Sequence, residues 1–270
     1  MSSLTTRRVP TSHGDIAVWD TEDDGTPLVL IHGNSSCREV FTRQFESDLA
    51  DEHRLIALDL PGHGQSDDAT DPVRTYSRSG FADCVVELLR ELGVSETAVF
   101  GWSLGGHIAI EMLPRVPGIK GLILSGTPPI RNRGFAEGFV ISPAQGLPRR
   151  RELSDADVEE FARIMFGASV PAFLRRAIRR ADGRLREQVF AASLAGEGVD
   201  QRLTVEESTV PIAVINGHDD PLVRLDYLES VAYGNLWEGR CQRLSGAGHA
   251  AFWHLPEAFN GLVQRFLTEI

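Results

Sequence analysis

A serine set between two glycines is the part of this sequence best suited to chemistry. Ser103 is the centre of the pentapeptide G-W-S-L-G at positions 101–105. The apolar residues 98–100 before it predict a strand, and the run 104–113 after it predicts a helix. A serine on such a tight turn has its hydroxyl forced out of the fold, and the glycines leave room for neighbouring backbone. The pattern predicts a nucleophile at Ser103, with a purely structural turn as the alternative.

A serine hydroxyl needs a base to take its proton, and an acid to orient that base. His249 follows a glycine-containing loop and is the expected base. The acid is expected between serine and histidine in the chain, where the buried-type strand 210–215 leads into an acidic turn. Asp220 is favoured because it lies three residues after Gly217, the usual spacing in such a fold. Asp219 stays open as the alternative acid, and its other explanation is a turn residue that satisfies local backbone N–H groups.

Two backbone N–H groups are expected to stabilise the negative charge that develops on the substrate oxygen. One belongs to Leu104 at the start of the helix after the nucleophile. The other belongs to Asn34, which follows the buried strand 27–31, and whose side chain is a candidate for substrate contact. His32 and His63 lie in glycine-containing loops, and we expect both to be structural.

The wider pattern predicts one α/β domain with a helical insertion. Strands and helices alternate up to about residue 129 and again from residue 210, which predicts a mostly parallel sheet with helices on both faces. Residues 1–129 and 210–270 are therefore expected to form the core, and residues 130–209 a helical cap or lid. Within the cap, Ser154 and Asp157 predict a capping box, and 171–182 predicts an amphipathic helix. In the core, residues 37–50 predict one helix.

Two aromatic side chains are candidates for the substrate pocket. Phe161 lies on the apolar face of a predicted cap helix, and the alternative is packing within the cap. Trp102 is adjacent to the nucleophile, and the alternative is packing against the sheet.

Composition limits the possible functions. The 270 residues carry a net charge of −11, which argues against nucleic-acid and acidic-membrane partners. No apolar run approaches the length of a membrane span, and the first residues lack the apolar core of a secretory signal. The three scattered cysteines favour a reducing compartment, so a cytoplasmic location is expected. Metal-binding and phosphate-binding motifs are absent, so we expect no cofactor and no metal. The oligomeric state stays open.

The sequence resembles the α/β-hydrolase superfamily from end to end, and within it the N-acyl-homoserine lactonases that degrade bacterial quorum-sensing signals. The similarity is carried by segments 32–36, 59–66 with 71–72, 99–112, 126–129, 216–217 with 225–226, 234–239 and 247–250. Two positions depart from those lactonases, in which a glutamate corresponds to Asp220 and a tyrosine to Phe161. The first change exchanges one triad acid for another, and the second removes a phenol hydrogen bond to substrate.

The resemblance implies a serine hydrolase that opens a neutral, partly apolar lactone through an acyl-enzyme, with Ser103, His249 and Asp220 as its triad. A carboxylesterase, an enol-lactone hydrolase or a C–C bond hydrolase shares this triad and stays open as an alternative. A non-catalytic ligand receptor on the same scaffold is a second alternative.

Overall fold

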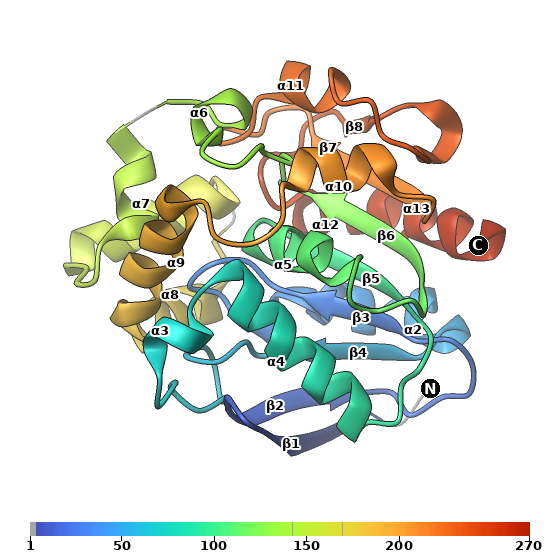
Figure 1. Cartoon of the computed structure of the whole chain (residues 1–270), viewed down its shortest axis with the longest axis horizontal. Helices are drawn as coiled ribbons and strands as arrows, with labels where there is room; N and C mark the ends of the chain where they lie inside the picture. Colours follow the sequence, from blue (N-terminus) through green and yellow to red (C-terminus); the bar gives the residue numbers. More distant parts are fainter. Residues whose placement is uncertain (1–3, 142, 169) are drawn as a thin grey trace.

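The frame of the molecule is a sheet of eight strands in the order β1-β2-β4-β3-β5-β6-β7-β8 (Figure 1). The structure is a computed structural model, which describes residues 4–141, 143–168 and 170–270. β1 and β2 pair antiparallel, as do β2 and β4, and every later pair is parallel. The strands are β1 Thr5–Thr11, β2 Gly14–Asp20, β3 Leu28–Ile31, β4 Leu55–Leu58, β5 Thr97–Trp102, β6 Ile119–Ser125, β7 Ile212–Gly217 and β8 Gln242–Leu244.

Helices cover both faces of this sheet, and an apolar core lies on each side. α4 and α5 pack on one face, whereas α12 and α13 pack on the other with a group of phenylalanines (Figure 1). The strands β3, β4 and β5 are buried along their whole length, as expected for parallel strands between two helical layers. The core helices are α1 Thr42–Phe45, α2 Asp48–Glu52, α3 Pro72–Thr75, α4 Arg78–Glu91, α5 Leu104–Met112, α11 Leu225–Glu229, α12 Ala251–His254 and α13 Pro256–Glu269.

The segment between β6 and β7 is helical, as the sequence predicted. It contains α6 Phe135–Gly138, the 3₁₀ helix η2 Pro143–Arg149, α7 Asp155–Phe166, α8 Ala172–Arg180, α9 Gly183–Ala195 and α10 Gln201–Glu207. The predicted capping box of Ser154 and Asp157 is present at the start of α7. Figure 1 shows α7, α8 and α9 grouped at one end of the sheet, whereas α10 packs against α5 of the core.

Two local predictions differ from the structure. The single helix expected over 37–50 is broken into the 3₁₀ helix η1 Arg38–Phe41, α1 and α2, because Ser47 ends one segment and caps the next through its hydroxyl. The strand β1 was not predicted. Only Val9 of its seven residues is buried, so this edge strand lacks the apolar alternation by which strands are recognised.

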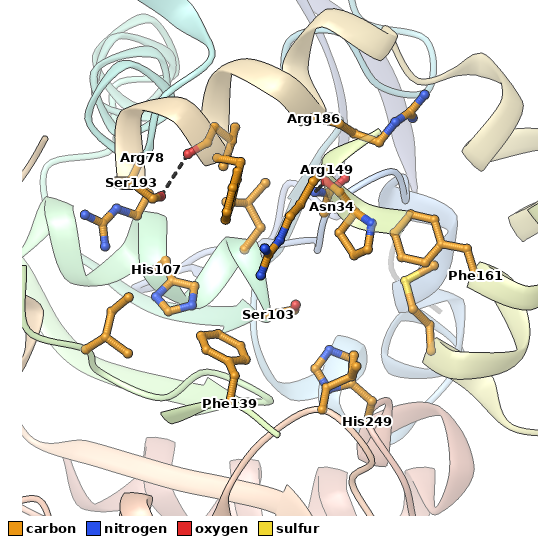
Figure 2. A pocket seen from close by; sticks show the side chains of 17 residues that line it. Asn34, Arg78, Ser103, His107, Phe139, Arg149, Phe161, Arg186, Ser193 and His249 are labelled. Carbon is orange, nitrogen blue, oxygen red and sulfur yellow. Dashed lines mark hydrogen bonds between the residues drawn. The ribbon is translucent and has the colours of Figure 1, made fainter. Parts of the chain in front are cut away.

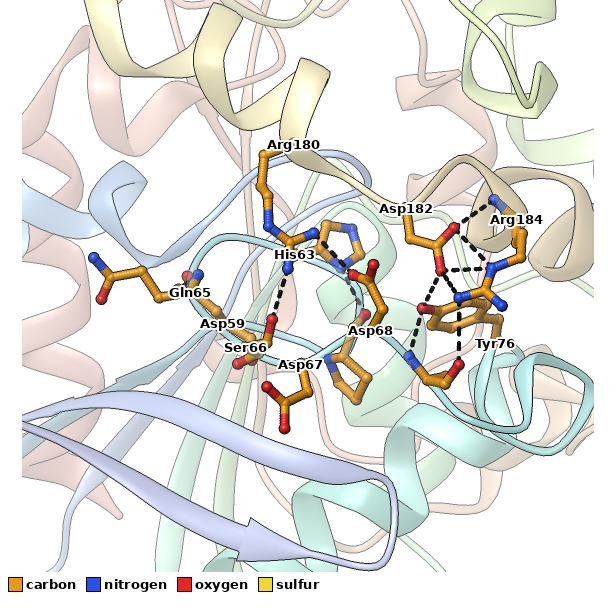
Figure 3. A network of polar contacts seen from close by, with 12 residues as sticks. Asp59, His63, Gln65, Ser66, Asp67, Asp68, Tyr76, Arg180, Asp182 and Arg184 are labelled. Atoms are coloured by element: carbon orange, nitrogen blue, oxygen red, sulfur yellow. Dashed lines mark hydrogen bonds and ion pairs between the residues drawn. The ribbon is translucent and has the colours of Figure 1, made fainter.

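Polar contacts join the junction of α8 and α9 to the loop after β4 (Figure 3). The Tyr76 hydroxyl donates to Asp182 Oδ2 at 2.7 Å and accepts the Ala69 N–H at 2.9 Å. Arg184 also pairs with Asp182, at 2.6 Å, and Arg180 pairs with Asp68 at 2.8 Å. The surface ion pairs contribute little individually, whereas the hydroxyl of the buried Tyr76 bonds to both segments.

Replacing this tyrosine by phenylalanine is expected to lower the free energy of unfolding by about 1–3 kcal/mol, because Tyr76→Phe leaves the buried Ala69 N–H without its acceptor. Urea unfolding measures the change. The matched control is Tyr233→Phe, since the Tyr233 hydroxyl is enclosed without a hydrogen-bond partner among the described residues. That control is expected to be neutral or slightly stabilising. Equal losses in the two variants would contradict the role given to the Tyr76 hydroxyl.

Candidate active site

Ser103 lies at the turn between β5 and α5, in a backbone conformation that side-chain-bearing residues rarely adopt. Its φ is 55° and its ψ is −118°. The flanking glycines are required by close approach: a Cβ on Gly101 would lie 2.4 Å from the Cα of Gly106, and one on Gly105 would lie 2.0 Å from the Ile31 carbonyl oxygen. The turn therefore holds the Ser103 side chain, which is partly exposed, at the edge of the sheet where the parallel strands end.

The structure brings His249 and Asp220 together beside this turn. His249 Nδ1 lies 2.9 Å from Asp220 Oδ2, and the two side chains are 2% and 1% exposed. The other carboxylate oxygen of Asp220 accepts the N–H groups of Leu222 and Val223 at 2.8 and 3.2 Å. Asp219 is exposed and donates its backbone N–H to the loop before the histidine. Asp220 is therefore the carboxylate that contacts the imidazole, and its hydrogen bonds fix its direction.

Ser103 and His249 line one cavity of about 140 Å³, and Figure 2 shows both side chains facing into it. No hydrogen bond joins the serine hydroxyl to the imidazole ring in the described part of the chain, and hydrogen bonds between catalytic groups often form only when substrate binds. Because Asp220 holds Nδ1, the Nε2 atom of His249 is left for the cavity. The walls are mostly apolar, and the helical segment contributes Ile130, Phe139, Pro148, Arg149, Phe161, Met165, Arg186, Val189, Phe190 and Ser193.

The loop after β3 runs beside Ser103, where the sequence places the second predicted oxyanion donor. A Cβ on Gly33 would lie 3.1 Å from the Cβ of Ser103, so the two backbones are close. Asn34 and Leu104 both line the cavity. The Asn34 amide nitrogen donates to the Pro148 carbonyl at 3.2 Å, so this side chain is held by the helical segment. The oxyanion roles of Asn34 and Leu104 stay predictions.

His32 and His63 are structural, as the sequence indicated. Both rings are fully buried, and burial lowers the pKa of each. As neutral rings they accept backbone N–H groups through Nε2: His32 from Leu60 and His63 from Ser35, both at 3.1 Å. These bonds tie the loop after β3 to the loop after β4.

The two aromatic candidates lie in different places. Phe161 lines the cavity from α7. Trp102 is fully buried and is not one of the residues that line the cavity. Its ring packs edge-on against Phe166 and Phe252, and its N–H donates to the His249 carbonyl oxygen at 3.0 Å. The structure therefore assigns Trp102 the packing role, the alternative that the sequence left open, and the proposed substrate contact is corrected.

Sequence reasoning missed five polar side chains of the cavity, among them Arg149 and His107. The Arg149 guanidinium lies 3.9 Å from the centre of the Phe190 ring and reaches into the cavity (Figure 2). Burial lowers the pKa of Arg149. In the sequence it is one of three consecutive arginines, a pattern typical of an exposed face. Another is His107, whose position one helical turn after Ser103 was the available signal.

Comparison with known proteins agrees with this architecture. A family model described as alpha/beta hydrolase fold matches residues 26–254, and the chain belongs to this family. Among solved structures, a mutant of the N-acyl homoserine lactonase AidH complexed with N-hexanoyl homoserine superposes with a TM-score of 0.97 and 43% identity, over 99% of this chain and 97% of that one.

Relatives with similar sequences include an esterase and a hydrolase of a different substrate class. A pimeloyl-[acyl-carrier protein] methyl ester esterase of Nitrosomonas europaea is 27% identical over 89% of this chain and 95% of its own length. A 2-hydroxy-6-oxononadienedioate/2-hydroxy-6-oxononatrienedioate hydrolase of Cupriavidus pinatubonensis is 28% identical over 97% and 95%. The chain is therefore an enzyme of the ester-hydrolase type.

Among the described residues, no helix is long and apolar enough to cross a membrane.

Proposed function

We propose that this enzyme opens the lactone ring of N-acyl-homoserine lactones. The observation that carries the proposal is the similarity, over nearly the whole chain, to a lactonase complexed with N-hexanoyl homoserine. The cavity supports it, because Ser103 and the His249–Asp220 pair face a mostly apolar space made partly by the helical segment. Such a space suits a neutral substrate with an acyl chain.

The reaction follows from the positions of these groups. His249 Nε2 takes the proton of Ser103, whose oxygen attacks the lactone carbonyl carbon. The N–H groups of Asn34 and Leu104 stabilise the oxyanion, each worth roughly 3 kcal/mol in the transition state. The ring C–O bond then breaks, and the alkoxide, still tethered to the acyl group, receives the proton from His249. Water activated by His249 cleaves the acyl-enzyme and releases N-acyl-homoserine.

Residues 130–209 are proposed to act as a cap over this chemistry. Ten of the residues that line the cavity come from this segment, among them Phe161 and Arg149. A cavity of about 140 Å³ is close to the ~150 Å³ that encloses one benzene molecule, so it holds a lactone ring with only a short chain. Longer acyl chains extend out of the cavity, which is partly open, or require the cap helices to move outward.

Substrate preference tests the proposal. With the purified chain, kcat/KM for N-hexanoyl homoserine lactone is expected to exceed that for unsubstituted γ-butyrolactone by at least about 100-fold, because the acyl chain adds apolar contacts in the cavity. The rate of ring opening is measured from the proton that the new carboxylic acid releases. p-Nitrophenyl butyrate serves as the comparison ester. Equal rates for the two lactones, with fast hydrolysis of the aryl ester, would instead indicate a carboxylesterase.

A further inference from the structure

His107 is a polar side chain of the cavity wall to which the triad chemistry gives no role. It lies in the first turn of α5, where its backbone N–H donates to the Ser103 carbonyl oxygen at 3.3 Å. Its side chain lines the same cavity as the nucleophile, and the residue is 8% exposed. Figure 2 shows His107 and Phe161 on opposite sides of Ser103. A group bound at the nucleophile is therefore within reach of the His107 ring.

Gln201 of α10 fixes the direction of this ring. Its amide nitrogen donates to the His107 backbone carbonyl at 2.9 Å, which determines the orientation of the buried amide. The Gln201 Oε1 atom then lies 2.6 Å from His107 Nδ1. An amide oxygen can only accept, so Nδ1 carries the hydrogen.

The other ring nitrogen, Nε2, is consequently an acceptor. Burial, and then the positive charge of Arg78, lower the pKa of His107 to about 4, so the ring is neutral near pH 7. Among the described residues none hydrogen-bonds to Nε2, and the atom is not sealed within the protein. Its lone pair is open to the cavity.

Acceptors of this kind are scarce in the cavity. The guanidinium groups of Arg78, Arg149 and Arg186 only donate. The Asn34 carbonyl oxygen already accepts the Ser35 hydroxyl at 2.8 Å, and the Ser193 hydroxyl, which donates to the Val189 carbonyl and can still accept, is the other side-chain acceptor of the cavity apart from the triad. A substrate N–H buried here needs an acceptor, since an unpaired buried donor is costly.

We propose that His107 is a specificity-determining residue whose Nε2 accepts the amide N–H of an N-acyl-homoserine lactone, with Gln201 as its positioning residue. The inference rests on the proposed function and adds to it the feature of the substrate that is recognised. The amide nitrogen is bonded to the carbon next to the lactone carbonyl, so the N–H is close to the carbon that Ser103 attacks, in the cavity that His107 also lines. Esters and lactones without a donor at this place lack the contact.

A matched pair of substrates isolates this hydrogen bond. N-hexanoyl homoserine lactone is compared with α-hexanoyloxy-γ-butyrolactone, in which an ester oxygen replaces the N–H, and opening of the lactone ring is measured by chromatography. The ratio of their kcat/KM values is expected to fall by about 10- to 100-fold in His107→Asn relative to the wild type. Intrinsic reactivity of the two lactones cancels in this comparison. Asparagine keeps a donor near the position of Nδ1 for Gln201 but removes the acceptor at Nε2.

Two further variants separate recognition from folding. His107→Phe fills the volume of the ring without either nitrogen. It should lower the ratio of the two kcat/KM values as much as His107→Asn does. His107→Gln places an amide oxygen near the position of Nε2, so its ratio should lie between that of His107→Asn and that of the wild type. Thermal unfolding midpoints identify any variant that fails to fold.

The outcomes distinguish the two proposals. Ring opening by the wild type with an unchanged ratio in His107→Asn overturns the role of His107 alone. A wild type that hydrolyses aryl esters but opens neither lactone overturns the proposed function, and the assignment of the amide N–H with it.

Discussion

Replacement of Ser103 by alanine is expected to lower kcat by about 10⁴- to 10⁶-fold on whichever ester or lactone the wild type turns over best. The oxygen that attacks the carbonyl is lost, whereas the oxyanion donors and the cavity remain. Substrate binding should change little, because the hydroxyl is small and the walls of the cavity come from other residues. Steady-state rates of ring opening measure the effect.

A fluorophosphonate probe provides the control for Ser103→Ala. The wild type should be labelled on Ser103, and the variant should not be labelled at all. A wild type that binds acyl-homoserine lactones but is neither labelled nor active would support the receptor alternative. A variant that keeps a tenth of the wild-type rate would show that another group is the nucleophile.

Replacement of Asp220 by asparagine is expected to lower kcat by about 10⁴-fold. The Asp220 carboxylate accepts the Nδ1 hydrogen of His249, which leaves Nε2 as the base. An amide at this position can donate to Nδ1 instead, so the ring would carry its hydrogen on Nε2 and could no longer accept the serine proton. Rates measured across a pH series exclude a simple shift of the optimum.

The adjacent aspartate is the matched control for Asp220→Asn. Asp219→Asn makes the same chemical change one residue away, on a side chain that is exposed. It is expected to stay within about threefold of the wild type. A large loss in Asp219→Asn with a small one in Asp220→Asn would reverse the assignment of the acid.

Much of the site could be predicted from the sequence, because the signals for it are local. The glycines around Ser103 are needed within one turn of the chain, and the capping box at Ser154 lies within four residues. The strands β3 and β5 are buried on both faces, so they stand out as continuous apolar runs. Each of these patterns has its physical cause within a few residues of the same segment, so it can be recognised without knowledge of the rest of the fold.

Other features depend on which segments meet in space. Trp102 could have pointed to either side of the turn, and its burial follows from Phe252 and Phe166, which lie far along the chain. The tautomer of His107 is set by a side chain 94 residues away. No pattern in either segment indicates that α10 packs against α5 in the register that brings these two residues together.

The sequence by itself therefore determined the class of fold and the turn that presents Ser103, and it predicted the order of nucleophile, acid and base. Only the tertiary structure decided that Asp220, not Asp219, contacts His249 and that Arg149 enters the cavity. The physical reason is that backbone conformation responds to neighbours within a few residues, whereas the direction of a side chain is set by the packing of elements far apart in the chain.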